Sequence, residues 1–258
     1  MKKLAIALTA IAAFTGPALA ADMPVRAPVY QPPVPVYNWT GFWISGGGGG
    51  GLWNADSNVV AFPSGLGLTR DQRLGGSGWF GTVGAGWDWQ ISPSWVFGIF
   101  GDGQFGEIRG SQSDPFNGIA GIEGREKLRD SWAAGVRLGY LVAPNVNSYV
   151  NAGYSGSEWS GTTLTSLIGG PGVATTGSFH RDGWFVGGGF ENSLNYFGIA
   201  APGWFMKTEY RSAFYDRITL PEIGTALPAT AVTFKPWVQT ISTSIVYRFN
   251  WSGAPVRY

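Results

Sequence analysis

The sequence contains no cysteine, one histidine and few charged residues. The missing cysteines exclude a disulfide framework and cysteine-based metal sites. Charged residues make up 13% of the chain, and 17 Lys and Arg nearly balance 16 Asp and Glu. A nucleic-acid-binding domain would need a clustered basic excess, so that class is excluded.

A long apolar run is also missing beyond the first twenty residues. The N-terminus carries Lys2 and Lys3, then the apolar stretch Leu4–Phe14, then Ala18-Leu19-Ala20. This order is typical of a secretory signal peptide with its cleavage site. A membrane anchor is the alternative, but the apolar stretch is shorter than the roughly 20 residues that span a bilayer. We therefore expect residues 1–20 to be a signal peptide and the protein to be exported.

Glycine and aromatic residues are abundant instead: 41 Gly, 13 Trp, 16 Phe and 10 Tyr. So many aromatics are incompatible with a disordered chain, and glycine without a three-residue period is not collagen. After removal of Lys2 and Lys3, 15 basic and 16 acidic residues remain. An exported, cysteine-free chain of this composition indicates a transmembrane β-barrel of a bacterial outer membrane.

Three further regions follow the signal peptide. Residues 21–38 are proline-rich and predict an extended periplasmic segment. Residues 39–250 predict the barrel, and residues 251–258 a C-terminal extension. Within the barrel, alternating apolarity marks eight segments: Trp39–Trp53, Leu74–Ile91, Trp95–Arg109, Arg129–Val142, Ser148–Ser160, Phe179–Leu194, Gly203–Tyr215 and Pro236–Asn250.

The connections between these segments alternate between short and long. Residues 92–94, 143–147 and 195–202 are short connections, whereas 54–73, 110–128, 161–178 and 216–235 are each close to 20 residues. Outer-membrane barrels have short periplasmic turns and long extracellular loops. We therefore expect an all-β fold: an eight-stranded antiparallel up-and-down transmembrane β-barrel with four long extracellular loops. A soluble β-sandwich would not explain the strict alternation.

Six consecutive glycines, Gly46–Gly51, lie in WISGGGGGGLW near the start of the first segment. A phosphate-binding loop would need a helix and usually a Lys-Ser/Thr after the glycines, and neither follows. Glycine in a strand marks a bend or a close approach of neighbouring groups. The run therefore predicts a tightly curved wall with a crowded interior.

Period-two alternation assigns one polar and one apolar face to each strand. The apolar face must see lipid, so the polar face lines the lumen. The predicted lumen charges are Asp88, Asp102, Arg137, Glu191, Lys207, Glu209, Arg211 and Arg248. Four acids against four bases predict a charge network that fills the lumen, since an unpaired buried charge is costly. A charge-selective pore is the alternative, although eight strands leave little more than side-chain room.

Aromatic residues near strand ends predict interfacial belts, where amphipathic rings sit at headgroup level. The predicted interfacial residues are Trp39, Trp43, Trp89, Trp95, Tyr140, Tyr149, Trp204, Trp237, Tyr247 and Phe249. The alternative is that they are ordinary core aromatics.

The single histidine, His180, is the only histidine that could act as a catalytic base, and either His180 or a loop tyrosine could be an axial haem ligand. His180 lies two residues from Asp182, so both side chains point the same way. No second histidine and no convincing serine nucleophile accompany it. We expect no enzyme activity, no catalytic, cofactor-binding or metal residues, and no cofactor; a protease or acyl transferase and a haemin-binding protein stay as alternatives.

Several stretches carry a family resemblance: ADMP (Ala21–Pro24), NWTGFWISG (Asn38–Gly46), FGIFGDGQ (Phe97–Gln104) and IVYRFNW (Ile245–Trp251). With the signal peptide and the proline-rich segment, they resemble the small outer membrane β-barrel proteins of alpha-proteobacteria, the RopB-like, porin-family proteins. The resemblance covers essentially the whole mature chain.

The resemblance implies an eight-stranded outer membrane barrel with a structural or surface role in the cell envelope. Some similar proteins bind haemin or are described as porins, so a narrow channel for small solutes and a haemin-binding surface protein are alternatives. It implies partners as well: outer membrane lipid, the barrel-assembly machinery, and peptidoglycan or surface ligands. Tyr247 and Phe249 match the aromatic C-terminal strand that the machinery reads, and WSGAPVRY continues to Tyr258.

Overall fold

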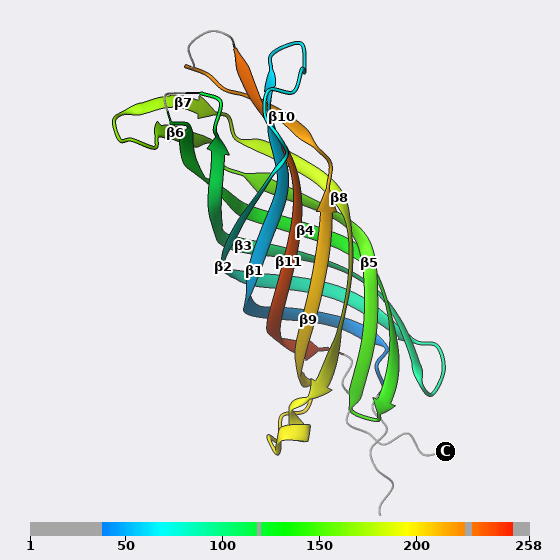
Figure 1. Cartoon of the computed structure of the whole chain (residues 1–258). Coiled ribbons are helices and arrows are strands. Elements are labelled where there is room, and N and C mark those ends of the chain that lie inside the picture. Colours follow the sequence, from blue (N-terminus) through cyan, green and yellow to red (C-terminus); the bar gives the residue numbers. More distant parts are fainter. Residues whose placement is uncertain (1–37, 118–119, 225–228, 250–258) are drawn as a thin grey trace, which may run out of the picture. The chain divides into compact units, whose positions relative to one another are not determined.

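The computed structural model describes residues 38–117, 120–224 and 229–249, in which eight long strands form the wall of a barrel (Figure 1). The predicted signal peptide, most of the proline-rich segment and the C-terminal extension lie outside these residues. None of the described residues forms a helix long and apolar enough to cross a membrane. The wall strands are β1 (Gly41–Ala61), β2 (Gln72–Gln90), β3 (Trp95–Asp114), β4 (Ile122–Ala143), β5 (Val146–Trp159), β8 (Phe179–Ser193), β9 (Trp204–Tyr215) and β11 (Thr230–Arg248).

The wall is closed by hydrogen bonds between its first and last strands. β1 pairs antiparallel with both β2 and β11, and every other wall strand pairs with its neighbours in the chain. A row of paired residues that starts at Trp43 passes through Phe100 and Phe185 and returns to β1 at Trp53, ten residues further along. For eight strands this stagger implies a tilt of about 40°. The predicted eight-stranded up-and-down barrel is confirmed.

The two ends of the barrel differ as the connections predict. Residues 91–94 and 144–145 form tight turns, and a single 3-10 turn, η1 (Leu194–Phe197), lies between β8 and β9. We call this the turn end, the end that the sequence predicts to face the periplasm. At the opposite, loop end the chain adds the strands β6 (Thr162–Ser166), β7 (Gly172–Thr176) and β10 (Ile218–Pro221) (Figure 1).

The strands at the loop end are longer than the sequence predicts. β1 continues eight residues past Trp53, and β4 begins at Ile122, seven residues before Arg129. Half of the predicted loop 54–73 and more than half of the predicted loop 110–128 are therefore strand, and β6 and β7 form a hairpin that pairs with β4. The sequence predicts strand only where apolar residues alternate on the lipid-facing side. Backbone pairing continues beyond these residues, because the segments that follow bury an apolar inner face.

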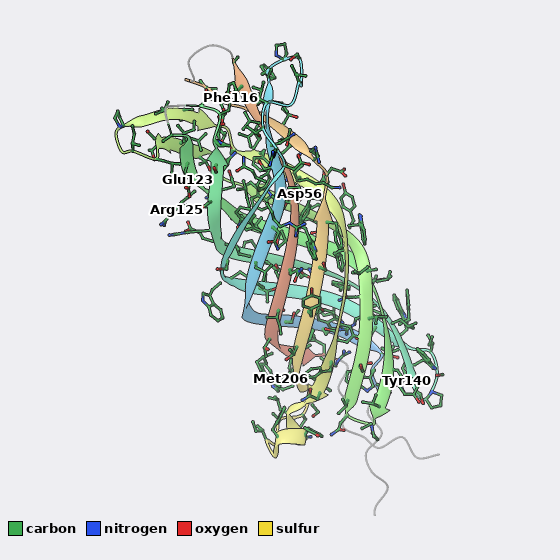
Figure 2. All side chains as sticks on the ribbon, in the orientation of Figure 1. Asp56, Phe116, Glu123, Arg125, Tyr140 and Met206 are labelled. Atoms are coloured by element: carbon green, nitrogen blue, oxygen red, sulfur yellow. The ribbon has the colours of Figure 1, made fainter. Side chains whose placement is uncertain are left out.

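Two belts of aromatic side chains surround the outer wall. Figure 2 shows Tyr140 near the turn end, and Glu123 and Arg125 on the outside near the loop end. The turn-end belt consists of Phe42, Trp87, Trp89, Trp95, Phe97, Tyr140, Trp204, Tyr247 and Phe249, and the loop-end belt of Trp79, Phe105, Trp132, Tyr154, Trp184, Phe214 and Trp237. On β11 the two belts are ten residues apart, from Trp237 to Tyr247, which for a strand tilted by about 40° is about 25 Å. That height matches the apolar band of an outer-membrane barrel.

Candidate functional site

The interior of the barrel gathers the predicted lumen charges. All eight lie on the inner face of the wall, and each side chain is less than a tenth exposed. They form two groups, which we call the lower and the upper ion cluster. The lower cluster is near the turn end and the upper cluster is near the middle of the membrane band.

The lower ion cluster is a ring of two arginines and two carboxylates. Arg137 donates from Nε to Asp88 Oδ1 at 2.8 Å and from Nη1 to Glu191 Oε2 at 3.1 Å. Arg248 donates from Nε to Glu191 Oε1 at 2.8 Å, and its Nη1 lies 2.8 Å from Asp88 Oδ2. Each guanidinium thus contacts both carboxylates. The ring is neutral, and the paired geometry offsets the cost of burying four charges.

Aromatic rings cover both guanidinium groups. Trp43 lies under Arg137 at 4.5 Å from its Cζ to the ring centroid, and Tyr149 lies at 5.3 Å. Trp39 lies 4.6 Å from Arg248 Cζ, and its backbone carbonyl accepts from Arg248 Nη1 at 3.2 Å. Such contacts stabilise a cation more strongly when water is excluded. Trp39 also donates its indole N–H to Pro144 O, across the turn end.

The structure therefore corrects the prediction for Trp39, Trp43 and Tyr149, which are buried inside the barrel and are not interfacial. Trp39 precedes β1 and carries no strand alternation. Trp43 lies between the apolar Phe42 and Ile44, so both faces of the strand are apolar here and alternation does not assign its face. The other seven predicted interfacial residues lie in the two outer belts.

The upper ion cluster joins β3 and β9. Arg211 forms a bidentate pair with Asp102, with distances of 2.8 and 2.6 Å, and contacts Glu209 Oε1 at 2.7 Å. Tyr149 donates its hydroxyl hydrogen to Glu209 Oε2 at 2.8 Å. Lys207 places its ammonium 5.1 Å from the Trp43 ring centroid. This cluster contains two acids and two bases, so it is also neutral.

An aromatic plug fills the interior above the upper ion cluster. Trp53, Trp159 and Phe234 have ring centroids 5.2–5.5 Å apart with edge-on geometry, and Phe179 stacks on Trp159 at 5.8 Å. Trp53 donates its indole N–H to Ile108 O at 3.1 Å. Trp53, Trp159 and Phe234 are 0–2% exposed. The plug therefore occupies the lumen at the outer edge of the membrane band.

A polar cap lies beyond the plug, above the membrane band. Thr230 donates its hydroxyl hydrogen to Glu222 Oε2 at 2.7 Å and accepts from Asn117 Nδ2 at 2.7 Å. Asn117 also donates to Asp114. Burial, together with the neighbouring Asp114 carboxyl, raises the pKa of Glu222 to about 7. Nearby, Glu126 accepts from Thr162 Oγ1 at 2.9 Å, and burial raises its pKa to about 7.

The plug and the cap are the parts of the interior that sequence reasoning missed. The sequence did carry a signal for the plug. Trp53 is ten residues from Trp43, an even spacing that puts both on one face of the strand. Phe234 lies on the opposite face from the charged Lys235. The cap had no such signal, because Asp114, Glu222 and Thr230 are brought together from segments that the sequence marks as loops.

The glycine run has two faces with different roles. A Cβ on Gly47 or Gly49 would overlap the backbone of β11, which crosses close to β1 on the inner side. On the outer side, Gly46 has nothing within 4 Å of its Cβ position. Close approach therefore accounts for Gly47 and Gly49, whereas Gly46, Gly48 and Gly50 leave the lipid-facing wall bare.

His180 lies on the outside of β8, above the loop-end belt. Its Nε2 is 2.8 Å from Asp182 Oδ1, and both side chains are almost half exposed. The structure thus brings together the two residues that the sequence pairs. Among the described residues no group of three or more His, Asp and Glu could hold a metal ion.

Comparison with known proteins places the chain among outer-membrane proteins. No protein-family model matches it. The chain is 26% identical over 253 residues to the 31 kDa outer-membrane immunogenic protein of Brucella melitensis biotype 1, covering 95% of this chain and 99% of that protein. It is 28% identical over 254 residues to the 25 kDa outer-membrane immunogenic protein of Brucella canis, covering 96% and 99%. These homologues confirm the resemblance to alpha-proteobacterial outer membrane barrels.

A solved structure shows the same fold. The outer membrane protein OprG of Pseudomonas aeruginosa superposes with a TM-score of 0.53 at 11% sequence identity, covering 82% of this chain and 98% of that chain. The protein is a surface or envelope protein of the outer membrane, as its relatives show.

Proposed function

We propose that this outer-membrane protein is a closed structural barrel that stabilises the cell envelope and presents its loop end to the outside, with neither a conducting lumen nor an enzymatic role. The observation that carries the proposal is the continuous filling of the interior. Two neutral ion clusters, the aromatic plug and the polar cap follow one another along the barrel axis, and their side chains are almost entirely buried. An eight-stranded barrel has room for side chains and little else.

The narrow-channel alternative would need a water path past these layers. Charges that line a water-filled pore keep their hydration, whereas here Arg137 and Arg248 are matched to Asp88 and Glu191 and are at most 3% exposed. Paired charges of this kind hold strands of opposite walls together. They link β2, β4, β8 and β11 in one ring.

The proposal is tested by solute efflux from proteoliposomes. Vesicles loaded with a small self-quenching dye and containing the purified protein should release it no faster than protein-free vesicles, whereas vesicles with a water-filled porin empty rapidly. The structural role is tested in cells: deletion should increase sensitivity to SDS and EDTA, and the wild-type chain should restore resistance. Rapid efflux through the wild-type protein, or unchanged sensitivity after deletion, would contradict the proposal.

A further inference from the structure

Charges are unevenly distributed around the outer wall just above the loop-end belt. On β3 and β4, Arg109, Lys127 and Arg129 face outward at this level, and we call them the basic rim. On β5 and β8 the same level carries Glu158 and Asp182 with His180. One side of the barrel is therefore basic at headgroup height, and another side is acidic.

The basic rim is only partly neutralised by the protein. Glu107 is one carboxylate between two cations: it contacts Arg109 Nη2, and its Oε1 lies 3.7 Å from Lys127 Nζ. Arg129 is exposed and has no ion pair with another described residue. Arg109 and Lys127 stay 53% and 35% exposed. Asp130, which pairs in register with the outward-facing Phe105, is a second carboxylate at this level, so three cations face two carboxylates and one positive charge remains for an external anion.

Beside the basic rim the lipid-facing wall is hollowed, over β1, β2, β9 and β11 in the larger hollow and up to Phe105 of β3 in the smaller. Two hollows, of about 740 and 490 Å³, adjoin at Trp79. We call them together the glycine groove, because the outward-facing Gly48, Gly50 and Gly81 give it a floor without side chains. Trp79 is 80% exposed and stands between the two hollows.

The glycine groove and the basic rim are continuous. Trp79 pairs in register with Glu107, the carboxylate that lies between Arg109 and Lys127. Phe105, which lines the smaller hollow, is four residues below Arg109 on the same face of β3. A molecule lying in the groove would therefore bring its polar end to the rim.

We propose that this surface binds a phosphorylated, multiply acylated glycolipid of the outer leaflet, the lipid A part of lipopolysaccharide. Arginine and lysine at headgroup level bind phosphate through charge-assisted hydrogen bonds. Small residues let an apolar chain approach the backbone closely. Within a membrane the hydrophobic effect does not drive apolar groups together, so close van der Waals packing of this kind stabilises the contact instead. A phosphate matches the surplus positive charge of the rim, and more than one acyl chain matches the two adjoining hollows. The site goes beyond the proposed function, because it uses the outer wall and does not depend on a closed lumen.

The phosphate contact is tested by native mass spectrometry of the refolded barrel with purified diphosphoryl lipid A. The wild-type protein should retain lipid A, and the triple variant Arg109→Gln, Lys127→Gln, Arg129→Gln should lose about tenfold or more in affinity. The matched control, Glu158→Gln with Asp182→Asn on the acidic side, should bind as the wild type does. A heat-shift gel on each variant verifies that the barrel is folded.

The groove is tested by filling it. Gly81→Leu places a side chain where no atom lies closer than 3.9 Å to the new Cβ, so the barrel should fold and lipid A binding should weaken. Gly46→Leu also faces lipid in open space but does not line either hollow, and it should leave binding unchanged. Wild-type affinity in the triple variant, or equal wild-type affinity for phosphatidylglycerol and diphosphoryl lipid A, would overturn the proposal.

Discussion

The interior of this barrel has two halves that are built by opposite rules. Inside the membrane band the strands turn polar residues inward and apolar residues outward: on β11, Thr240 and Ser244 face in while Ile241 and Ile245 face out. Above the band the polarity of the two faces of β11 reverses: the inward Phe234 is apolar and buried, and the outward Lys235 is charged and exposed.

The reversal follows from the solvent outside the wall. Lipid requires an apolar outer face, so the polar residues of the lower strands face inward. The charges among them are buried there and must be paired. Water outside the upper wall permits a polar outer face, so the upper interior can be an ordinary apolar core. The lower half relies on ion pairs and cation–ring contacts, and the upper half on aromatic packing. Different substitutions should therefore destabilise the two halves separately.

The largest effect is expected from the lower ion cluster. Arg137→Met leaves Asp88 and Glu191 with one guanidinium between them, and removal of one partner from a buried ionic network costs about 3–5 kcal/mol. Urea unfolding in detergent micelles, followed by tryptophan fluorescence, should show this loss in the free energy of unfolding. The exposed Arg125→Met serves as control and should change little. An unchanged midpoint for Arg137→Met would mean that the ring does not stabilise the lower half.

The aromatic plug should be nearly as important for the upper half. Trp159→Ala removes a fully buried ring that contacts Trp53, Phe179 and Phe234, and such truncations cost about 3–5 kcal/mol. The matched control is Trp184→Ala, which removes an indole from the lipid-facing belt and should cost clearly less. The same unfolding assay compares them. Equal losses would contradict the assignment of a packed core to the loop end.

The polar cap should make the loop end sensitive to pH. Because the pKa of Glu222 and that of Glu126 are raised from 4.5 to about 7, the folded loop end binds more protons than the unfolded chain between these values. Its stability should therefore be highest at acidic pH and fall as pH rises from about 4.5 to 7, by at most roughly 3 kcal/mol for each group.

Hydrogen exchange of residues 114–126 and 218–230 at pH 5.5 and 8, corrected for intrinsic rates, measures this difference. Glu222→Gln and Glu126→Gln together should remove most of it. Protection that rises with pH in the wild-type protein would show that the sign is wrong.

The glycine run offers the finest comparison, between adjacent residues on the two faces of one strand. Gly47→Ala forces β1 away from the β11 backbone, and overpacking of this kind costs about 1–3 kcal/mol. Gly46→Ala points into open space and should change stability by less than about 0.5 kcal/mol. Thermal unfolding by heat-shift gel ranks the two. The reverse order would contradict the register between β1 and β11.

Much of the lower half could be predicted from the sequence, because lipid imposes a strict alternation. Asp88, Asp102 and Arg211 could be assigned to the inner face from their apolar neighbours alone. Their pairing could not: which acid meets which base depends on the stagger of the strands, which no local pattern encodes. Trp39 and Trp43 were assigned to the wrong face, because tryptophan is equally suited to an interface and to a cation contact inside.

The upper half was harder to predict because its alternation reverses. Segments such as 54–61 and 122–128 are polar on the outside, and a polar surface with turn residues is also typical of loops. Trp53 and Trp159 marked ends of the predicted strands when they in fact form the middle of a core. The lipid-facing pattern therefore locates the membrane band and does not define the length of the strands.

Conductance of the wild-type protein in a planar lipid bilayer tests the central claim most directly. A barrel filled by two ion clusters and an aromatic plug should insert without producing stepwise current above the background. Reproducible unitary steps from folded wild-type protein would show that water and ions pass the interior, and would contradict a closed barrel.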